Sequence, residues 1–532
     1  MRVKIPLIFI HFLLLPIITP SSSDAPAKKL KVLAVFSHPG KSHFDVFKPL
    51  LEELAHRGHH LTVVSYFPRT NSSRLPNYDD IDLGAVDVFL DVVDLKQIKH
   101  STLTIFYEFM LLRQWGLDHC QKNLGNENLQ RLVKSNAEFD VIITEVFNSD
   151  CFLGFVHRFK APFIGLSSHV LFPWANERIS NEQNPSYVPA ILVGFEPKMN
   201  FMQRMGNYLI PKVFNFGFEV LYNRPMQKMV EKVFGPDVPR LRDIAKNMSA
   251  ILVNTHHSLH WAKPHLPNVV EIGGLHLSKK RESIPEDIQR FLDDAEEGVL
   301  FFSWGSMIKA SSMDQDTLRE ILKVLRSVPW KVLWKWEDEF LPGKPDNVMI
   351  KKWLPQAAIL GHPNVKCYLA HGGLLGVSEA ASAGVPMVIV PMYGDQFNNA
   401  AAARSRGVAI VLKWSNFNAE SLKSAIENVF NDPSYMTNAK ALQRSWHDRP
   451  MSPLEMSVWW TEYVARGHGN KFLKTAAADL AWYQLEHLDV IAFLLVTIFI
   501  VASVLYKLVK MIIRKMFVSE KKRQSKSSKK EN

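Results

Sequence analysis

The feature that most constrains the fold of this chain is an apolar stretch near its C-terminus, from Leu488 to Tyr506. Its 19 residues include one charged side chain, Asp489, and as a helix they can span a hydrocarbon core about 30 Å thick. A buried core helix would have a similar composition, but the lysines and arginines that follow have no place in a core. We therefore predict a transmembrane helix over 488–506, with nearly all of the chain on one side of it.

Lysines and arginines gather in the segment that follows this stretch. Residues 507–532 hold ten of them against two glutamates, and so carry +8 of the formal net charge of +11. A basic balance often indicates a nucleic-acid partner, but a basic block next to an apolar helix is a membrane-flanking feature. We expect no nucleic-acid partner. The positive-inside rule places the tail in the cytosol and the body of the chain in the lumen.

Both ends of the chain also resemble targeting signals. Residues 1–23 combine two early basic residues, an apolar run broken by prolines and a serine-rich end, which is typical of a secretory signal peptide. Lys529 and Lys530 resemble a dilysine endoplasmic-reticulum retrieval signal. Asn71 and Asn247 each begin an Asn-x-Ser glycosylation acceptor. Together these patterns predict a single-pass type I protein of the endoplasmic-reticulum membrane with a luminal body.

Short apolar runs alternate with helical patterns through this body. In the first half the strand-like runs are Leu30–Phe36, Leu61–Val64, Val141–Thr144 and Phe163–Leu166. After a charged break at 277–285 the pattern restarts, with strand-like runs at Val299–Ser303, Lys331–Trp334, Val365–Leu369 and Pro386–Pro391. Such alternation is typical of parallel α/β sheets. We therefore expect an α/β protein with two facing Rossmann-like domains.

The predicted organisation has six parts. In chain order these are a signal peptide (1–23), a first α/β domain (24–278), a second α/β domain (286–450), helices that pack back (451–487), the transmembrane helix (488–506) and a basic tail (507–532). Residues 180–243 are rich in Phe, Met, Tyr and Pro. We expect this segment to be helical and to form an apolar cleft on the first domain, although such residues more often serve as plain core.

The residues that can carry chemistry are concentrated between Trp353 and Gln396. A strand-like run is followed by His371-Gly372-Gly373, and a helical pattern begins at Leu374. Glycines let the backbone approach a ligand closely, and the amides and positive dipole end of a helix N-terminus favour a pyrophosphate. Further along the helix, the carboxylate of Glu379 can accept hydrogen bonds from two ribose hydroxyls.

This ordered set resembles the signature of the UDP-glycosyltransferase family, the UDP-glucuronosyl- and glucosyltransferases of animal endoplasmic reticulum, and the insect members most closely. The resemblance covers nearly the whole chain and includes Gly40–His43, Arg57–His59 and Phe302–Ser306. It implies a two-domain GT-B fold plus the C-terminal transmembrane helix. It also implies an inverting transfer of a hexose from a UDP-sugar, bound by the second domain, to a hydroxyl of a small lipophilic acceptor, bound by the first.

The resemblance further implies a role for each residue of the donor site. These are Trp353 stacked on uracil, Gln356 on the nucleoside, Ser306, His371 and Gly373 on the diphosphate, Glu379 on the ribose, and Asp395 with Gln396 on the hexose.

By the same resemblance His43 is the general base. Its imidazole suits removal of a proton from a phenol or alcohol near neutral pH, and a carboxylate should orient it as in a catalytic triad. The family usually has an aspartate directly after the strand that ends here at Thr144. That position is Glu145 in this chain, with Asp150 five residues later. Both stay candidates, with a slight preference for Asp150, and His38 is the competing histidine.

No metal or other cofactor is expected. The helix N-terminus and His371 would neutralise the diphosphate without one. Asp80 and Asp82 mimic a metal-binding Asp-x-Asp motif, but we expect them in an exposed acidic loop. The three cysteines include no pair at metal-ligand spacing, and their odd number excludes a framework that pairs all of them within the chain.

Two departures from the family pattern affect the choice of sugar. Ala370 stands where the family usually has Thr or Ser, and Leu375 where mammalian members often have a polar residue that contacts the donor. Loss of a polar contact favours UDP-glucose and leaves UDP-glucuronate open. The expected function is detoxification or the conjugation of a hormone or pigment. The alternative is a non-catalytic UDP-sugar-binding or lipophile-binding membrane protein with the same fold, and a homo-oligomer is compatible with either.

Overall fold

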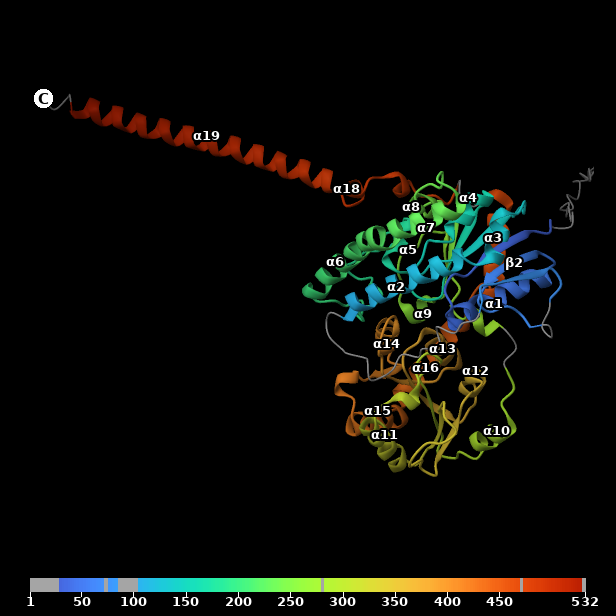
Figure 1. The fold of residues 1–532 in the computed structure, drawn as a ribbon. Helices are drawn as coiled ribbons and strands as arrows, with labels where there is room; N and C mark the ends of the chain where they lie inside the picture. The colour runs from blue at the N-terminus through green and yellow to red at the C-terminus, as the bar shows by residue number, and fades with distance from the viewer. Residues whose placement is uncertain (1–27, 71–74, 85–103, 279–281, 469–471, 529–532) are drawn as a thin grey trace, which may run out of the picture.

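The computed structural model describes residues 28–70, 75–84, 104–278, 282–468 and 472–528 (Figure 1). The body consists of an upper and a lower α/β unit, and one long helix extends away from it. The expected signal peptide, the acceptor at Asn71 and the two terminal lysines lie outside the described residues.

The upper unit is built on a seven-stranded parallel sheet with the order β3-β2-β1-β4-β5-β6-β7. The strands are β1 (Lys31–Val35), β2 (His60–Ser65), β3 (Tyr78–Asp82), β4 (Val141–Glu145), β5 (Phe163–Ser167), β6 (Ala250–Val253) and β7 (Val269–Glu271). Successive side chains of a strand point to opposite faces, so Leu33 and Val35 pack in one hydrophobic core and Val32 and Ala34 in another. Both faces are therefore covered, as parallel sheets require.

Nine α-helices belong to the described part of the upper unit. They are α1 (Lys41–His56), α2 (Thr104–Leu124), α3 (Glu127–Lys134), α4 (Leu153–Phe159), α5 (Pro173–Arg178), α6 (Phe201–Gly217), α7 (Arg224–Phe234), α8 (Leu241–Ala245) and α9 (His257–His260). Helix α6 begins with a capping box, in which the side chains of Asn200 and Gln203 each accept a hydrogen bond from the backbone N–H of the other residue. A π-helical turn, Phe218–Asn223, joins α6 to α7. The predicted helical segment at 180–243 thus contains α6 and α7 and the first residues of α8.

The lower unit has a six-stranded parallel sheet with the order β10-β9-β8-β11-β12-β13. The strands are β8 (Val299–Ser303), β9 (Lys331–Lys335), β10 (Val348–Lys351), β11 (Val365–Ala370), β12 (Met387–Ile389) and β13 (Ala409–Val411). The helices are α10 (Glu286–Asp293), α11 (Gln315–Ser327), α12 (Gln356–Leu360), α13 (Leu374–Ala383), α14 (Gln396–Ser405), α15 (Ala419–Asn431) and α16 (Pro433–His447). Each sheet reverses its strand order once, between β1 and β4 and between β8 and β11. Ligands bind at the carboxyl ends of the strands at such switch points.

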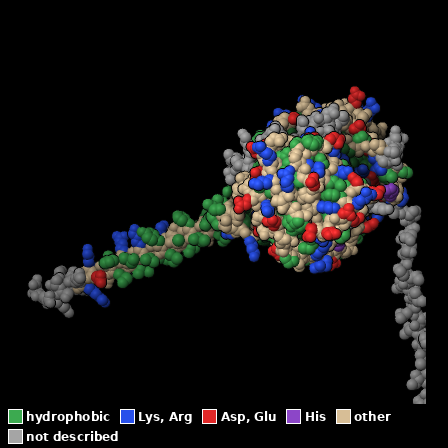
Figure 2. Space-filling model, turned by 90° about the horizontal axis from the view of Figure 1, so that it is seen from below, with side chains coloured by type: hydrophobic (Ala, Val, Ile, Leu, Met, Phe, Trp, Pro, Cys, Tyr) green, Lys and Arg blue, Asp and Glu red, His purple; other side chains and the backbone are tan. Residues whose placement is uncertain are grey.

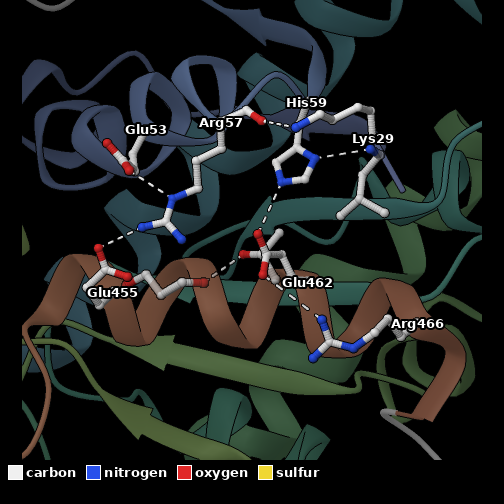
Figure 3. Close-up of polar contacts among 10 residues, drawn as sticks. Lys29, Glu53, Arg57, His59, Glu455, Glu462 and Arg466 are labelled. Atoms are coloured by element: carbon white, nitrogen blue, oxygen red, sulfur yellow. Dashed lines mark hydrogen bonds and ion pairs between the residues drawn. The ribbon is translucent and has the colours of Figure 1, made fainter. Parts of the chain in front are cut away.

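After the lower unit the chain returns to the upper one. Helix α17 (Pro453–Tyr463) packs on α1 (Figure 3). Nη2 of Arg57 donates to Oε1 of Glu455 over 2.6 Å. Nδ1 of His59 accepts the backbone N–H of Leu30, and its Nε2 lies 3.2 Å from Oε1 of Glu462. The chain therefore connects the two units twice, through the linker that precedes α10 and through the segment between α16 and α17.

A single helix, α19 (Leu488–Ser528), follows the short α18 (Trp482–Leu485). Within the described part of the chain, its stretch Leu488–Arg523 is the one helix long and apolar enough to cross a membrane. Figure 2 shows hydrophobic side chains along the part nearest the body and basic side chains farther out. The helix does not end at Tyr506 but continues into the basic tail, because the tail has no Gly or Pro before Ser528 to break it.

The structure places the acidic pair Asp80 and Asp82 and the three cysteines. Asp80 and Asp82 do not lie in an exposed loop: they belong to the edge strand β3, where Oδ2 of Asp80 accepts the backbone N–H of Arg69. Edge strands tolerate charged residues because one side of the strand is open. Cys120 and Cys151 form a disulfide between α2 and the loop before α4, and the third cysteine, Cys367, is free and buried.

Candidate active site

The carboxyl edge of the upper sheet brings together His43 and Glu145. His43 lies in the first turn of α1, which follows β1, and Glu145 ends the neighbouring strand β4. Nδ1 of His43 lies 2.6 Å from Oε1 of Glu145 and 3.0 Å from the hydroxyl of Ser168, which follows β5. Because β1, β4 and β5 are adjacent and parallel, these three side chains meet at the switch point of the sheet.

The two partners differ in their exposure. The side chain of Glu145 is 2 % exposed, whereas that of His43 is 20 % exposed. The carboxylate of Glu145 accepts a hydrogen bond from Nδ1 of His43. It therefore favours the imidazole tautomer that carries its proton on Nδ1. Among the described residues, Nε2 of His43 has no hydrogen-bond partner. Nε2 is therefore the nitrogen that can take a proton from a molecule in front of this edge.

Asp150, the slightly preferred partner of His43, does not contact it. Its carboxylate forms a buried ion pair with Arg178, whose chain comes from α5. Burial raises the pKa of Asp150, and the opposing charge of Arg178 counteracts that rise. Asp150 and Glu145 line the same small cavity, but only Glu145 extends to His43. The preference for Asp150 was therefore wrong on geometry, because a position five residues past the strand end points behind the site.

Neutral rings surround His43. The ring centroid of Phe147 lies 4.7 Å from that of His43, and the centroids of His38 and His169 lie 4.6 and 5.9 Å away. Burial lowers the pKa of His38 well below its ordinary value and that of His169 to about 3. Both are therefore uncharged near neutral pH. His38 is a packing group of this wall, and the wall suits an apolar molecule next to Nε2 of His43.

The carboxyl edge of the lower sheet presents His371 and the start of α13. His371 follows β11, and its ring lies so close to two glycines that a Cβ on Gly373 would be 2.3 Å from its Nε2 and one on Gly305 2.7 Å from its Cε1. Burial lowers the pKa of His371 to about 4. The imidazole is therefore neutral near pH 7, so it can donate the expected hydrogen bond to a diphosphate but does not help to neutralise its charge.

The backbone next to His371 is shaped for a close approach. Gly372 has a φ of +91°, and a Cβ there would lie 3.0 Å from Cγ2 of Ile389. Gly373 is the N-cap of α13 and provides no side-chain cap, so the first-turn amides stay available to an anion. Ser306 is exposed in the turn after β8, on the other side of the same switch point.

Glu379 lies further along α13 in a desolvated setting. Burial raises its pKa to about 7, and the hydrogen bond from Nε2 of Gln356 opposes this rise. His276, from the end of the upper unit, lies 3.7 Å from Oε1 of Glu379, which is too long for a hydrogen bond. Burial keeps the pKa of His276 at about 4, so it adds no charge. Trp353, 66 % exposed after β10, leaves its ring open to a ligand.

Asp395 and Gln396 begin α14 but play different parts. Oε1 of Gln396 accepts the backbone N–H groups of Met392 and Tyr393, so its carbonyl oxygen stabilises its own loop. Asp395 accepts a hydrogen bond from Nδ2 of Asn399. Burial raises the pKa of Asp395, and the hydrogen bond from Asn399 and the nearby imidazole of His43, from the upper unit, oppose this rise.

The sequence did not indicate three residues that lie where the upper and lower units meet. Oε1 of Glu108, on α2, accepts the backbone N–H of Gly394, and burial raises its pKa to about 7. Asn399 donates to the carbonyl of Gly372 as well as to Asp395 and so fixes the glycine turn. His276 is the third. Asn399 could have been found from its place one helical turn after Asp395, whereas Glu108 and His276 meet the lower unit only through the tertiary fold.

Comparison with protein families gives one match over nearly the whole chain. A family model described as UDP-glucoronosyl and UDP-glucosyl transferase matches residues 31–524. UDP-glycosyltransferase UGT5 of Dactylopius coccus is 36 % identical and covers 96 % of both chains. UDP-glucosyltransferase 2 of the same insect is 38 % identical over 88 % of this chain and 90 % of its own length. Human UDP-glucuronosyltransferase 2B15 is 30 % identical over 91 % of this chain and 93 % of its own.

Solved structures give the same fold at lower identity. The glycotransferase of kitacinnamycin has a TM-score of 0.54 at 16 % identity and covers 82 % of this chain and 98 % of its own. The calicheamicin glycosyltransferase CalG4 also has a TM-score of 0.54, at 17 % identity, with 83 % and 99 % covered. Two facing parallel α/β units of this kind constitute the GT-B fold.

Proposed function

This chain belongs to the family of UDP-glucuronosyl and UDP-glucosyl transferases, and from that premise we propose that it transfers a hexose from a UDP-sugar to a hydroxyl of a small lipophilic acceptor, with inversion. The observation that carries the proposal is the contact of His43 with Glu145 at the switch point of the upper sheet, which leaves Nε2 of His43 open. The His371–Gly373 part of the predicted donor motif follows β11, next to the switch point of the lower sheet.

The proposed step uses the two ring nitrogens of His43 differently. Nε2 takes the proton of the acceptor hydroxyl, and the oxygen forms a bond to the anomeric carbon of the sugar. The bond from that carbon to the diphosphate oxygen breaks, and UDP leaves with the electron pair. Nδ1 keeps its hydrogen bond to Glu145, whose carboxylate orients the ring and stabilises the imidazolium. Attack opposite the leaving group inverts the anomeric centre.

The donor side would be held without a metal. The uncapped amides of α13, His371 and Ser306 would bind the diphosphate, with Gly373 allowing the approach. Because His371 is neutral, the helix amides carry most of the electrostatic stabilisation.

Trp353, Gln356 and Glu379 would bind the nucleoside. Glu379, released from Gln356, would accept hydrogen bonds from the ribose hydroxyls. Asp395 would accept one from the hexose. The side chain of Gln396 supports that loop through its carbonyl oxygen, which leaves only its amide group for the sugar.

Glucose is the favoured hexose. Leu375 is apolar where a polar donor contact is frequent in mammalian members, and a relative with 38 % identity is named a UDP-glucosyltransferase. The acceptor is proposed to be a phenol or similar lipophile, because the groups around His43 are aromatic or neutral. Conjugation of such compounds serves detoxification or the handling of hormones and pigments.

The cellular setting is proposed to be the luminal side of the endoplasmic-reticulum membrane. The helix α19 is the candidate anchor, and its basic extension favours a cytosolic tail. A disulfide between Cys120 and Cys151 fits an oxidising compartment. Asn247, exposed next to the short helix α8, is the described glycosylation acceptor.

The test uses the full chain in phospholipid nanodiscs with labelled UDP-glucose or UDP-glucuronate and a panel of phenols and alcohols. We expect transfer from UDP-glucose to exceed transfer from UDP-glucuronate, and nuclear magnetic resonance of the glucoside to show the β anomer. A folded sample that binds UDP in calorimetry but transfers no sugar from any UDP-sugar would overturn the proposal and support the non-catalytic binding protein.

A further inference from the structure

Helix α6 presents an apolar face to the outside of the molecule. Met202, Met205, Leu209, Val213 and Phe216 recur three and four residues apart, so they form one stripe along the helix. All five are exposed, Phe216 to 72 % and Met202 to 66 %. A stripe of this kind normally faces a protein core, but here it faces away from one.

The opposite side of α6 accounts for its attachment to the body. Asn207 and Phe214 are buried; the ring of Phe214 stacks on Phe109 of α2 at 4.6 Å, and the amide of Asn207 donates to backbone carbonyls of the preceding loop. The helix is therefore held firmly by one face, and its outer face is a fixed feature. Soluble proteins rarely expose contiguous apolar surface of this extent without a partner.

The beginning of the membrane helix lies directly beside this face. Glu486, two residues before α19, accepts hydrogen bonds from Tyr208 over 3.1 Å and from Lys212, and both donors belong to α6. Trp482 and Tyr483 of α18, in the same short connection, are also exposed. Figure 1 shows α18 directly above the layer that contains α5 and α6. Aromatic side chains with a polar tip are enriched where a protein meets the lipid headgroups.

We propose that the apolar face of α6 lies in the interfacial layer of the bilayer that α19 crosses, so that the body is docked on the membrane and not merely tethered to it. The lipid surface is the occupant because residue 486, bonded to α6, stands where the chain enters the membrane. A helix with one apolar and one anchored face can rest in the headgroup region at little cost.

Site-specific fluorescence in the full chain tests the proposal. The chain is suited to it, because two of its cysteines form a disulfide and burial raises the pKa of the third, Cys367, far above the range in which it would react. Leu209→Cys is labelled with a nitrobenzoxadiazole probe, and the protein is placed in phosphatidylcholine nanodiscs. The control is Lys423→Cys on α15 in the lower unit, where the lysine side chain is 44 % exposed.

We expect nitroxide-labelled lipids to quench the probe at position 209 and aqueous iodide to leave it bright, with the reverse at position 423. Quenching of position 209 by iodide, as at 423, would overturn the proposal. Protection from iodide without quenching by lipid would also overturn it, because protein and not lipid would then cover the face. Met205→Cys, on the same stripe, replaces Leu209→Cys if that variant unfolds before the wild type in a thermal melt.

Discussion

The two α/β units place a histidine at the same point of the fold but surround it differently. His43 follows β1 and His371 follows β11, each next to the switch point of its sheet. His43 is held at Nδ1 by the carboxylate of Glu145, whereas burial keeps the pKa of His371 at about 4 and no described group bonds its Nδ1. A charged partner equips one imidazole to accept a proton, and desolvation equips the other to donate a neutral hydrogen bond. Substitutions at and around the two histidines test this difference.

The largest effect is expected from His43→Ala. Loss of a general base should lower kcat by about 10²–10⁴-fold, because Nε2 of His43 is the nitrogen assigned to the proton transfer. UDP binding, measured by calorimetry, should stay unchanged, since the donor is assigned to the lower unit. His56→Ala, at the exposed far end of the same helix, is the matched control and should keep full activity. Equal losses of kcat and UDP affinity in His43→Ala would refute the division of roles.

Arg178→Met separates the two carboxylates of the upper unit. The variant leaves Asp150 buried without its partner and should reduce the unfolding free energy by about 3–5 kcal/mol, measured by urea unfolding in detergent. Since Glu145 and not Asp150 bonds His43, the pH–rate profile of the folded enzyme should not move. Arg178→Met combined with Asp150→Asn should recover most of the stability. A shifted profile would mean that Asp150 takes part in orienting His43 after all.

His371→Ala addresses the other histidine of the comparison. It removes one hydrogen bond to a charged diphosphate, which is worth about 1.5–3 kcal/mol. The KM for the UDP-sugar should therefore rise by about 10–150-fold, while kcat at saturating donor falls less than in His43→Ala. His362→Ala, in the loop between α12 and β11, is a control outside the site. A kcat loss as large as that of His43→Ala would make His371 part of the proton chemistry.

These contrasts also show what the sequence could predict. The alternation of apolar runs and helical patterns predicted the central strands of both sheets, because β1 and β11 each consist of buried apolar residues apart from one exposed lysine. Strands β3, β6, β7, β10 and β13 were not predicted. Three of the five residues of β3 are aspartates, and β7 and β13 have only three residues each, which carry no periodicity. The motif from Trp353 to Gln396 located the donor side because its residues are close in the chain.

The parts of the site that depend on tertiary packing were predicted less well. The choice between Glu145 and Asp150 required the position of a strand end within one residue. A one-residue change in where β4 stops turns the next side chains away from the site. Glu108, on α2, lies 286 residues before Gly394 in the chain. No local sequence pattern therefore predicts the contact between them. His371 is neutral because it is buried, and its burial depends on tertiary packing that the sequence alone does not predict.

The smallest effect concerns pH, through Glu379. Its pKa in the folded chain is about 7, raised by burial above the ordinary value of 4.5. Between these values the folded state holds a proton that the unfolded state has lost, so this group's contribution to stability is fully present below pH 4.5 and declines as pH rises toward 7. Glu379→Gln should flatten that part of the curve of melting temperature against pH.

Ligand binding should respond to the same group with the opposite sign. The deprotonated carboxylate accepts hydrogen bonds from ribose hydroxyls better than the acid does, so UDP should bind more tightly at pH 8 than at pH 6, by calorimetry. Asp432→Asn, which changes an exposed carboxylate at the N-cap of α16, should keep the full pH dependence. If the Glu379→Gln variant keeps the wild-type pH dependence of UDP binding, another group causes that dependence. The donor side would then differ from the His43 side in the pairing of its charged groups but not in the protonation of Glu379.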